Sequence, residues 1–87
     1  GYVRALSGKT EVLVRGRRCP VVGMICMDQT LVDVTGLPVE PGDVATLIGC
    51  DGGERITPND LAALLGSTPH EVTCLISKRV PRRYTTL

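Results

Sequence analysis

Few residues in this chain could carry out chemistry. It contains one histidine, His70, and two lysines, Lys9 and Lys78. A lone histidine in a loop is usually an exposed polar residue, although its imidazole could titrate near neutral pH. A lysine that reacts with a carbonyl group needs a desolvated site, which a domain of this size does not readily build. No Ser/His/Asp arrangement is present, so the sequence predicts no catalytic residue.

The four cysteines offer no metal chemistry. They are Cys19, Cys26, Cys50 and Cys74, and no two of them form a C-x-x-C pair. We therefore expect no zinc site and no other metal site. Each cysteine lies in or beside an apolar run, where a reduced thiol packs as a small hydrophobic group. The sequence predicts reduced, buried cysteines in a cytoplasmic protein.

One segment joins apolar and polar residues without a turn signal between them. Residues 23–29 read Gly-Met-Ile-Cys-Met-Asp-Gln, so an apolar run meets a carboxylate and an amide directly. Two interpretations remain open. A core strand could end at the surface, with Met27 filling a gap and Asp28 solvated, or the polar groups could belong to a site.

Nucleic-acid and phosphate binding are not favoured. The formal net charge is +1, and the aromatic residues are only Tyr2 and Tyr84, so there is no stacking platform for bases. Two arginine clusters are interpreted as an exposed hairpin and a solvated chain segment: Arg15, Arg17 and Arg18, and Arg79, Arg82 and Arg83. Residues 49–53 are glycine-rich but lack the lysine and hydroxyl residue of a P-loop, which favours a hairpin loop.

The elements that must position these residues are mostly strands. The chain of 87 residues suits one domain, and 43% of its residues are hydrophobic without any Phe or Trp. Val, Leu and Ile must fill the core, which favours strands. A chain this short buries roughly 60 to 65% of its unfolded surface, so we expect a partner surface to pack on it. The start resembles no signal peptide, no apolar run could span a membrane, and the missing Met predicts a fragment.

Alternation and turn residues predict the strands. They are expected over residues 11–15, 20–27, 31–35, 44–48 and 71–77, with an extended edge over 80–84. Gly16 predicts a hairpin after the first strand. The almost wholly apolar second strand is expected to be buried on both faces, with a bulge or a close backbone approach at Gly23. His70 falls in the loop before the last of these strands.

One short helix is predicted over residues 58–65. Thr57 suits the N-cap, Pro58 the first helical position, and Asp60 the capping box, while Gly66 ends the helix. Several short strands with one such helix are typical of a small, mostly β domain. The predicted fold is therefore a Greek-key, β-barrel-like domain with one short α-helix.

The whole chain also resembles a known family. The residues that carry the resemblance are Gly-Tyr-Val-Arg (1–4) with Leu-Ser (6–7), Val-Leu-Val (12–14), Pro-Val-Val-Gly (20–23), Ile-Cys-Met-Asp-Gln (25–29), Val-Asp-Val (32–34), Glu-Arg-Ile-Thr (54–57) and Arg-Val-Pro-Arg (79–82). In order and spacing they resemble the alanine racemase family. The resemblance implies that residues 1–87 are its C-terminal β domain, without the N-terminal TIM barrel.

The resemblance implies a function that this chain would not perform alone. Members of the family interconvert L- and D-alanine with pyridoxal 5'-phosphate, supply D-alanine for peptidoglycan, and work as cytoplasmic homodimers. Their Lys and Tyr bases belong to the part of the protein that precedes this domain, and the Lys carries the cofactor. The chain would complete the active site of the partner subunit and be inactive by itself.

Four residues are implicated near that site. Met27 matches the position whose backbone N–H meets the substrate carboxylate, and Asp28 would shape the substrate entrance. His70 stands where the family commonly has a Tyr near the cofactor phosphate, and Met24 where it commonly has an Arg. Because of these two departures, serine or broader racemisation stays open, as does a non-catalytic interaction module.

Overall fold

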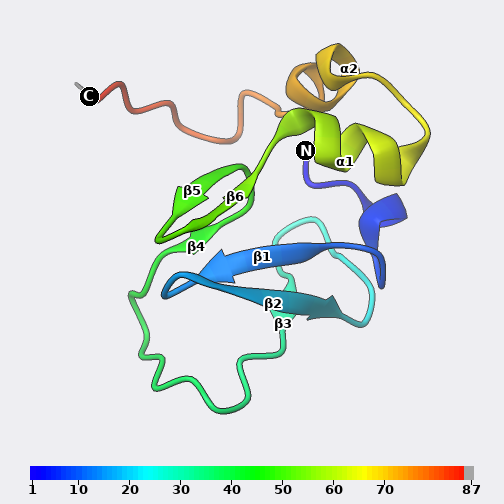
Figure 1. Cartoon of the computed structure of the whole chain (residues 1–87). Helices are drawn as coiled ribbons and strands as arrows, with labels where there is room; N and C mark the ends of the chain where they lie inside the picture. Colours follow the sequence, from blue (N-terminus) through cyan, green and yellow to red (C-terminus); the bar gives the residue numbers. More distant parts are fainter. Residues whose placement is uncertain (86–87) are drawn as a thin grey trace.

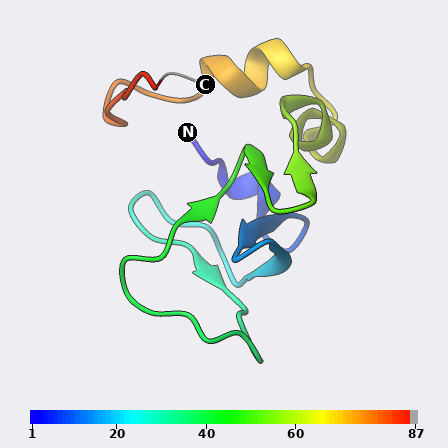
Figure 2. The ribbon, with the colours of Figure 1, turned by 60° about the vertical axis from the view of Figure 1, so that its left-hand side comes forward.

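The computed structural model describes residues 1–85 (Figure 1). Its elements are η1 (Arg4–Leu6), β1 (Glu11–Val14), β2 (Arg17–Val22), β3 (Leu31–Val32), β4 (Ala45–Thr46), β5 (Gly49–Asp51), β6 (Glu54–Ile56), α1 (Pro58–Leu65) and α2 (Pro69–Cys74). Figures 1 and 2 show the two helices together at one end of the molecule and the long β3–β4 connection at the other.

The strands confirm the predicted Greek key. Four of them form an antiparallel sheet in the order β3-β2-β1-β4. Three consecutive strands are thus joined as a meander, and β4 returns to pair with β1, which is the Greek-key arrangement. The β5–β6 hairpin packs against β1 and β4 and extends the barrel-like layer. The mostly β fold class is confirmed.

A tight hairpin joins β1 to β2, as Gly16 predicts. Val14 pairs with Arg17, and the two loop residues Arg15 and Gly16 have φ angles of 50° and 75°. Two consecutive positive φ angles are typical of a type I′ turn, whose twist matches that of the flanking strands. The Gly16 N–H donates to Asp51 Oδ2 at 2.9 Å, which ties this hairpin to β5.

The second strand is shorter than predicted and is not buried on both faces. It ends at Val22, and its burial alternates, with Cys19 and Val21 buried and Arg18 exposed. Gly23 has a φ of 68°, which turns the chain out of the sheet instead of forming a bulge within it. The residues after it are therefore a loop and not a strand.

Other strands are shorter as well. The predicted strands over 31–35 and 44–48 are reduced to β3 and β4, each of two residues. The glycine-rich residues 49–53 include β5, and Gly52 and Gly53 alone form the turn of the β5–β6 hairpin. Residues 81–85 form no strand, so the predicted edge over 80–84 is wrong.

Helix α1 confirms the predicted helix and both of its ends. The Thr57 side chain accepts from the Asp60 N–H at 3.2 Å, and the Asp60 carboxylate accepts from the Thr57 N–H at 2.8 Å. Pro58 occupies the first turn, and Gly66 is left-handed with a φ of 65°. The backbone N–H donation to Asp60 is the largest cause that lowers the pKa of its carboxyl.

A second helix stands where a strand was predicted. Helix α2 begins at Pro69, and Thr68 caps it by accepting from the Glu71 N–H at 3.3 Å. Val72, Cys74 and Ile76 alternate in the sequence as one side of a strand would, but only Val72 is buried. His70 therefore lies in the first turn of α2 and not in a loop.

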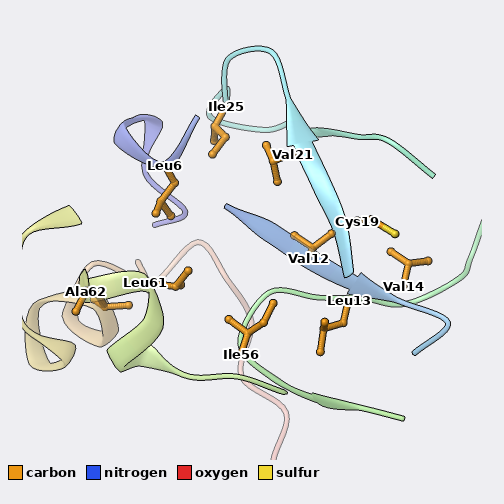
Figure 3. Packing of buried hydrophobic residues seen from close by; sticks show 11 residues of the cluster. Leu6, Val12, Leu13, Val14, Cys19, Val21, Ile25, Ile56, Leu61 and Ala62 are labelled. Carbon is orange, nitrogen blue, oxygen red and sulfur yellow. The ribbon is translucent and has the colours of Figure 1, made fainter. Parts of the chain in front are cut away.

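The core is aliphatic and lies between the sheet and α1. Its fully buried side chains are Leu6, Val12, Leu13 and Leu61, which come from η1, β1 and α1 (Figure 3). Cys19 is the buried cysteine, whereas Cys26, Cys50 and Cys74 are exposed free thiols, contrary to the expectation of burial. Val, Leu and Ile fill the core, as the composition predicts.

Candidate functional site

A groove of about 860 Å³ lies beside the loop between β2 and β3. Its walls come from three separate stretches of the chain, within residues 1–4, 24–32 and 77–81, together with Val12, Ala45 and Leu47. The loop includes the mixed apolar and polar segment that the sequence singled out. The fold thus places that segment on an open surface.

Met27 and Asp28 form the tip of a tight turn in this loop. The Cys26 N–H donates to the Gln29 carbonyl oxygen at 2.9 Å and closes the turn. The Met27 side chain is 88% exposed, so it does not fill a core gap. Within residues 1–85 its backbone N–H has no hydrogen-bond acceptor. The tip therefore offers an unpaired donor to a bound molecule.

The base of the turn is fixed. Ile25 is 4% exposed and belongs to the core cluster, and its N–H donates to Ser7 Oγ at 2.8 Å. A buried side chain and a hydrogen bond to a separate segment hold the loop two residues before Met27. The donor at the tip is thus presented from an anchored base.

Asp28 forms an ion pair across the groove. Its carboxylate accepts from the Arg79 guanidinium, 51 residues further along the chain. The two side chains are 72% and 64% exposed, so the pair contributes at most about 1 kcal/mol. From the residues alone Arg79 is interpreted as part of a solvated cluster, because no local pattern signals a contact over that separation.

The structure brings three of the four predicted site residues together. Met24, Met27 and Asp28 all line the groove, and Met24 is 55% exposed there. His70 does not line it; it lies exposed on α2, and its carbonyl oxygen accepts from Thr73 Oγ1 at 3.0 Å. His70 is therefore exposed at the surface of this chain, away from the groove.

The groove is suited to binding and not to proton transfer. Tyr2 lines it, and burial raises the pKa of its hydroxyl, partly offset by the hydrogen bond to Thr10 Oγ1 at 3.4 Å. A phenol with a raised pKa stays neutral at pH 7. The part of the lining that the structure describes contains no lysine or histidine. The carboxylate that lines the groove, that of Asp28, is already paired with Arg79.

The chain does not fit a covalently held cofactor. Lys9 and Lys78 are both exposed, so neither has the desolvated environment that a reactive lysine needs. Across residues 1–85, no three His, Cys, Asp or Glu side chains are grouped as metal ligands. None of the helices in the described part is long and apolar enough to cross a membrane.

Comparisons with known proteins agree with this geometry. A family model described as alanine racemase, C-terminal domain, matches residues 1–84. The alanine racemase of Symbiobacterium thermophilum is 54% identical over 85 residues, which are 97% of this chain and 22% of that protein.

Solved structures show the same relationship. The alanine racemase from E. faecalis superimposes with a TM-score of 0.87 at 42% identity, over 95% of this chain and 22% of that one. The alanine racemase from Bartonella henselae, solved with covalently bound pyridoxal phosphate, gives 0.82 at 34% identity, over 98% of this chain and 24% of that one.

The fold is a small, mostly β domain with a groove beside an exposed turn. The chain belongs to the alanine racemase family and is the C-terminal domain of that family. It spans about a fifth of the length of the relatives it matches.

Proposed function

We propose that the full-length protein is an alanine racemase, an isomerase that interconverts L- and D-alanine in the cytoplasm and so supplies D-alanine for peptidoglycan. In this proposal it is a homodimer, and the C-terminal domain completes the active site of the partner subunit. Family membership and the names of the relatives support the activity. The single observation that carries the domain's role is the unpaired Met27 N–H at the edge of the groove.

Racemisation requires groups that this chain does not provide. The α-proton must leave from one face of the substrate and return on the other, so an acid/base group is needed on each side. Bound pyridoxal 5'-phosphate would supply an electron sink for this chemistry. We assign the two acid/base groups and the cofactor to an N-terminal TIM-barrel domain, because both lysines here are exposed surface residues.

The contribution of this chain is to hold the substrate. A backbone N–H that donates to a carboxylate makes a charge-assisted bond, which is stronger than a bond between neutral groups. The Met27 N–H is free to do so because the turn leaves it unpaired. The buried Ile25 and the bond to Ser7 hold this donor in position, so little freedom is lost when substrate binds.

Two substitutions at Met27 separate the backbone role from the side-chain role. In the full-length protein, Met27→Pro removes the N–H and should raise KM for alanine roughly 10- to 100-fold, as expected for a lost bond to a charged group. Met27→Ala keeps the N–H and removes only an exposed side chain, so its KM should stay close to wild type. Equal KM values for the two variants would contradict the assignment.

Two observations favour a second candidate, a serine or broad-specificity racemase. Met24 lines the groove as an uncharged residue, and His70 is an exposed imidazole on α2. Both differ from the residues that the family resemblance implies at these positions. A third candidate, a non-catalytic interaction module, rests on the absence of acid/base machinery from the described lining of the groove.

A further inference from the structure

A second arginine organises the turn that carries Arg79. The Arg82 guanidinium donates to three backbone carbonyl oxygens, those of Ile76 at 3.0 Å, Ser77 at 2.9 Å and Val80 at 2.6 Å. Arginine suits this task because its planar head holds several donors in a fixed fork. The contacts gather the chain after α2 into one compact turn, which we call the clamped turn (residues 76–80).

Arg79 lies within the clamped turn and reaches out of it to Asp28. The clamped turn is also closed by the Val80 N–H, which donates to the Ser77 carbonyl oxygen at 3.2 Å. An exposed ion pair between two freely moving side chains gains almost nothing, because ordering both of them costs conformational entropy. When the backbone of one partner is already fixed, less freedom is lost in forming the pair. The clamped turn therefore favours the contact between Arg79 and Asp28.

Asp28 in turn is the neighbour of Met27 at the tip of the loop. The base of that loop is anchored by Ile25, but the described contacts give the tip only the turn bond from Cys26 and the pair with Arg79. A chain of contacts thus runs from Arg82 through the clamped turn to Arg79, then to Asp28 and to the Met27 backbone.

We propose that Arg82 is a positioning residue for the substrate-binding turn. By holding the clamped turn it aims Arg79 at Asp28 and so limits the motion of the Met27 N–H. The effect on substrate rests on the proposed function, whereas the effect on the loop does not. Arg82 itself does not line the groove, so its influence passes through Arg79.

The first test measures the loop directly. Hydrogen–deuterium exchange of the full-length protein reports on the Ile25 and Cys26 amides, whose hydrogen bonds form the base and the closing bond of the turn. Arg82→Ala should speed exchange of the Cys26 amide severalfold and leave that of the anchored Ile25 amide nearly unchanged. The matched control is Arg83→Ala, because Arg83 is exposed and donates no hydrogen bond within residues 1–85, and it should leave exchange unchanged. Equal exchange in the two variants would overturn the inference.

The second test measures substrate binding. Arg82→Ala should raise KM for alanine roughly two- to fivefold with little change in kcat, the range expected for loss of one exposed ion pair. Arg82→Lys keeps the charge but not the fork, and its KM should fall between those of Arg82→Ala and wild type. If Arg82→Ala folds poorly, the KM of Arg82→Lys provides the test instead.

A coupling experiment distinguishes positioning from a general structural role. In an Arg79→Ala background the substitution Arg82→Ala should raise KM no further, because the contact it supports is already gone. Independent, additive effects of the two substitutions would overturn the inference. If Arg82→Ala changes loop exchange but the wild type turns over no amino acid, the proposed function fails and the positioning role stands. If the wild type is active and Arg82→Ala matches Arg83→Ala in KM and exchange, the positioning role fails alone.

Discussion

The hydroxyl of Ser7 accepts a hydrogen bond from the backbone N–H of Ile25 at 2.8 Å, and this contact joins the segment after η1 to the base of the Met27 turn. Ser7→Ala leaves that N–H in a partly buried place without its partner, at a cost of about 1 kcal/mol. We expect KM for alanine to rise two- to fivefold in the full-length protein, as roughly 1 kcal/mol implies. Ser7→Thr keeps a hydroxyl and is the control; a KM unaffected by either substitution would count against the anchor.

Gly52 should tolerate no side chain. Its φ is 62°, and a Cβ atom there would lie 3.1 Å from the Cα of Gly16, where the two hairpins meet. Gly52→Ala should destabilise the protein by about 1–3 kcal/mol through backbone strain. Gly53→Ala is a close control, since nothing lies within 4 Å of a Cβ atom at that position. Calorimetric unfolding of both variants should show a lower Tm for Gly52→Ala only, and equal Tm values would refute the close approach.

Stability should depend on pH through Asp60. The hydrogen bond from the Thr57 N–H lowers the pKa of this carboxyl below its ordinary value of 3.8. A group whose pKa is lower in the folded state stabilises the fold above the unfolded pKa, and that stabilisation is lost as pH falls through the folded pKa. The Tm difference between wild type and Asp60→Asn should therefore hold steady from pH 7 to about 5 and shrink in stronger acid. A Tm difference between the two proteins that grew as the pH fell would contradict this prediction.

The two helices show which signals could be predicted from sequence. Thr57, Pro58 and Gly66 define both ends of α1 through local hydrogen bonds and backbone preferences, and these are visible in a few residues. Thr68 and Pro69 carry the same signal for α2, whereas the alternation from Val72 onward favours a strand. A short surface helix can pack on the core with one buried side chain, which here is Val72. Alternation of apolar residues over so short a segment therefore does not distinguish a helix from a strand.

The residues that line the groove can be predicted from sequence only in part. Met27 and Asp28 stood out because polar groups follow an apolar run, but their place at a turn depends on Gly23, which leaves the sheet with a positive φ. The partners Ser7 and Arg79 come from distant parts of the chain. Such contacts are set by how strands and loops meet in space, and no local pattern encodes them. Only the resemblance places His70 near the site, and within this chain His70 lies outside the groove.

The most direct test of the account is amino-acid racemisation by the full-length protein, with and without added pyridoxal 5'-phosphate, compared with residues 1–87 alone. We predict that L- and D-alanine are interconverted by the full-length protein and that the isolated domain turns over neither. Preference for serine would contradict the proposed substrate and direct attention to Met24 and His70. Racemisation by the isolated domain, or no turnover of either amino acid by the full-length protein, would contradict the central claim.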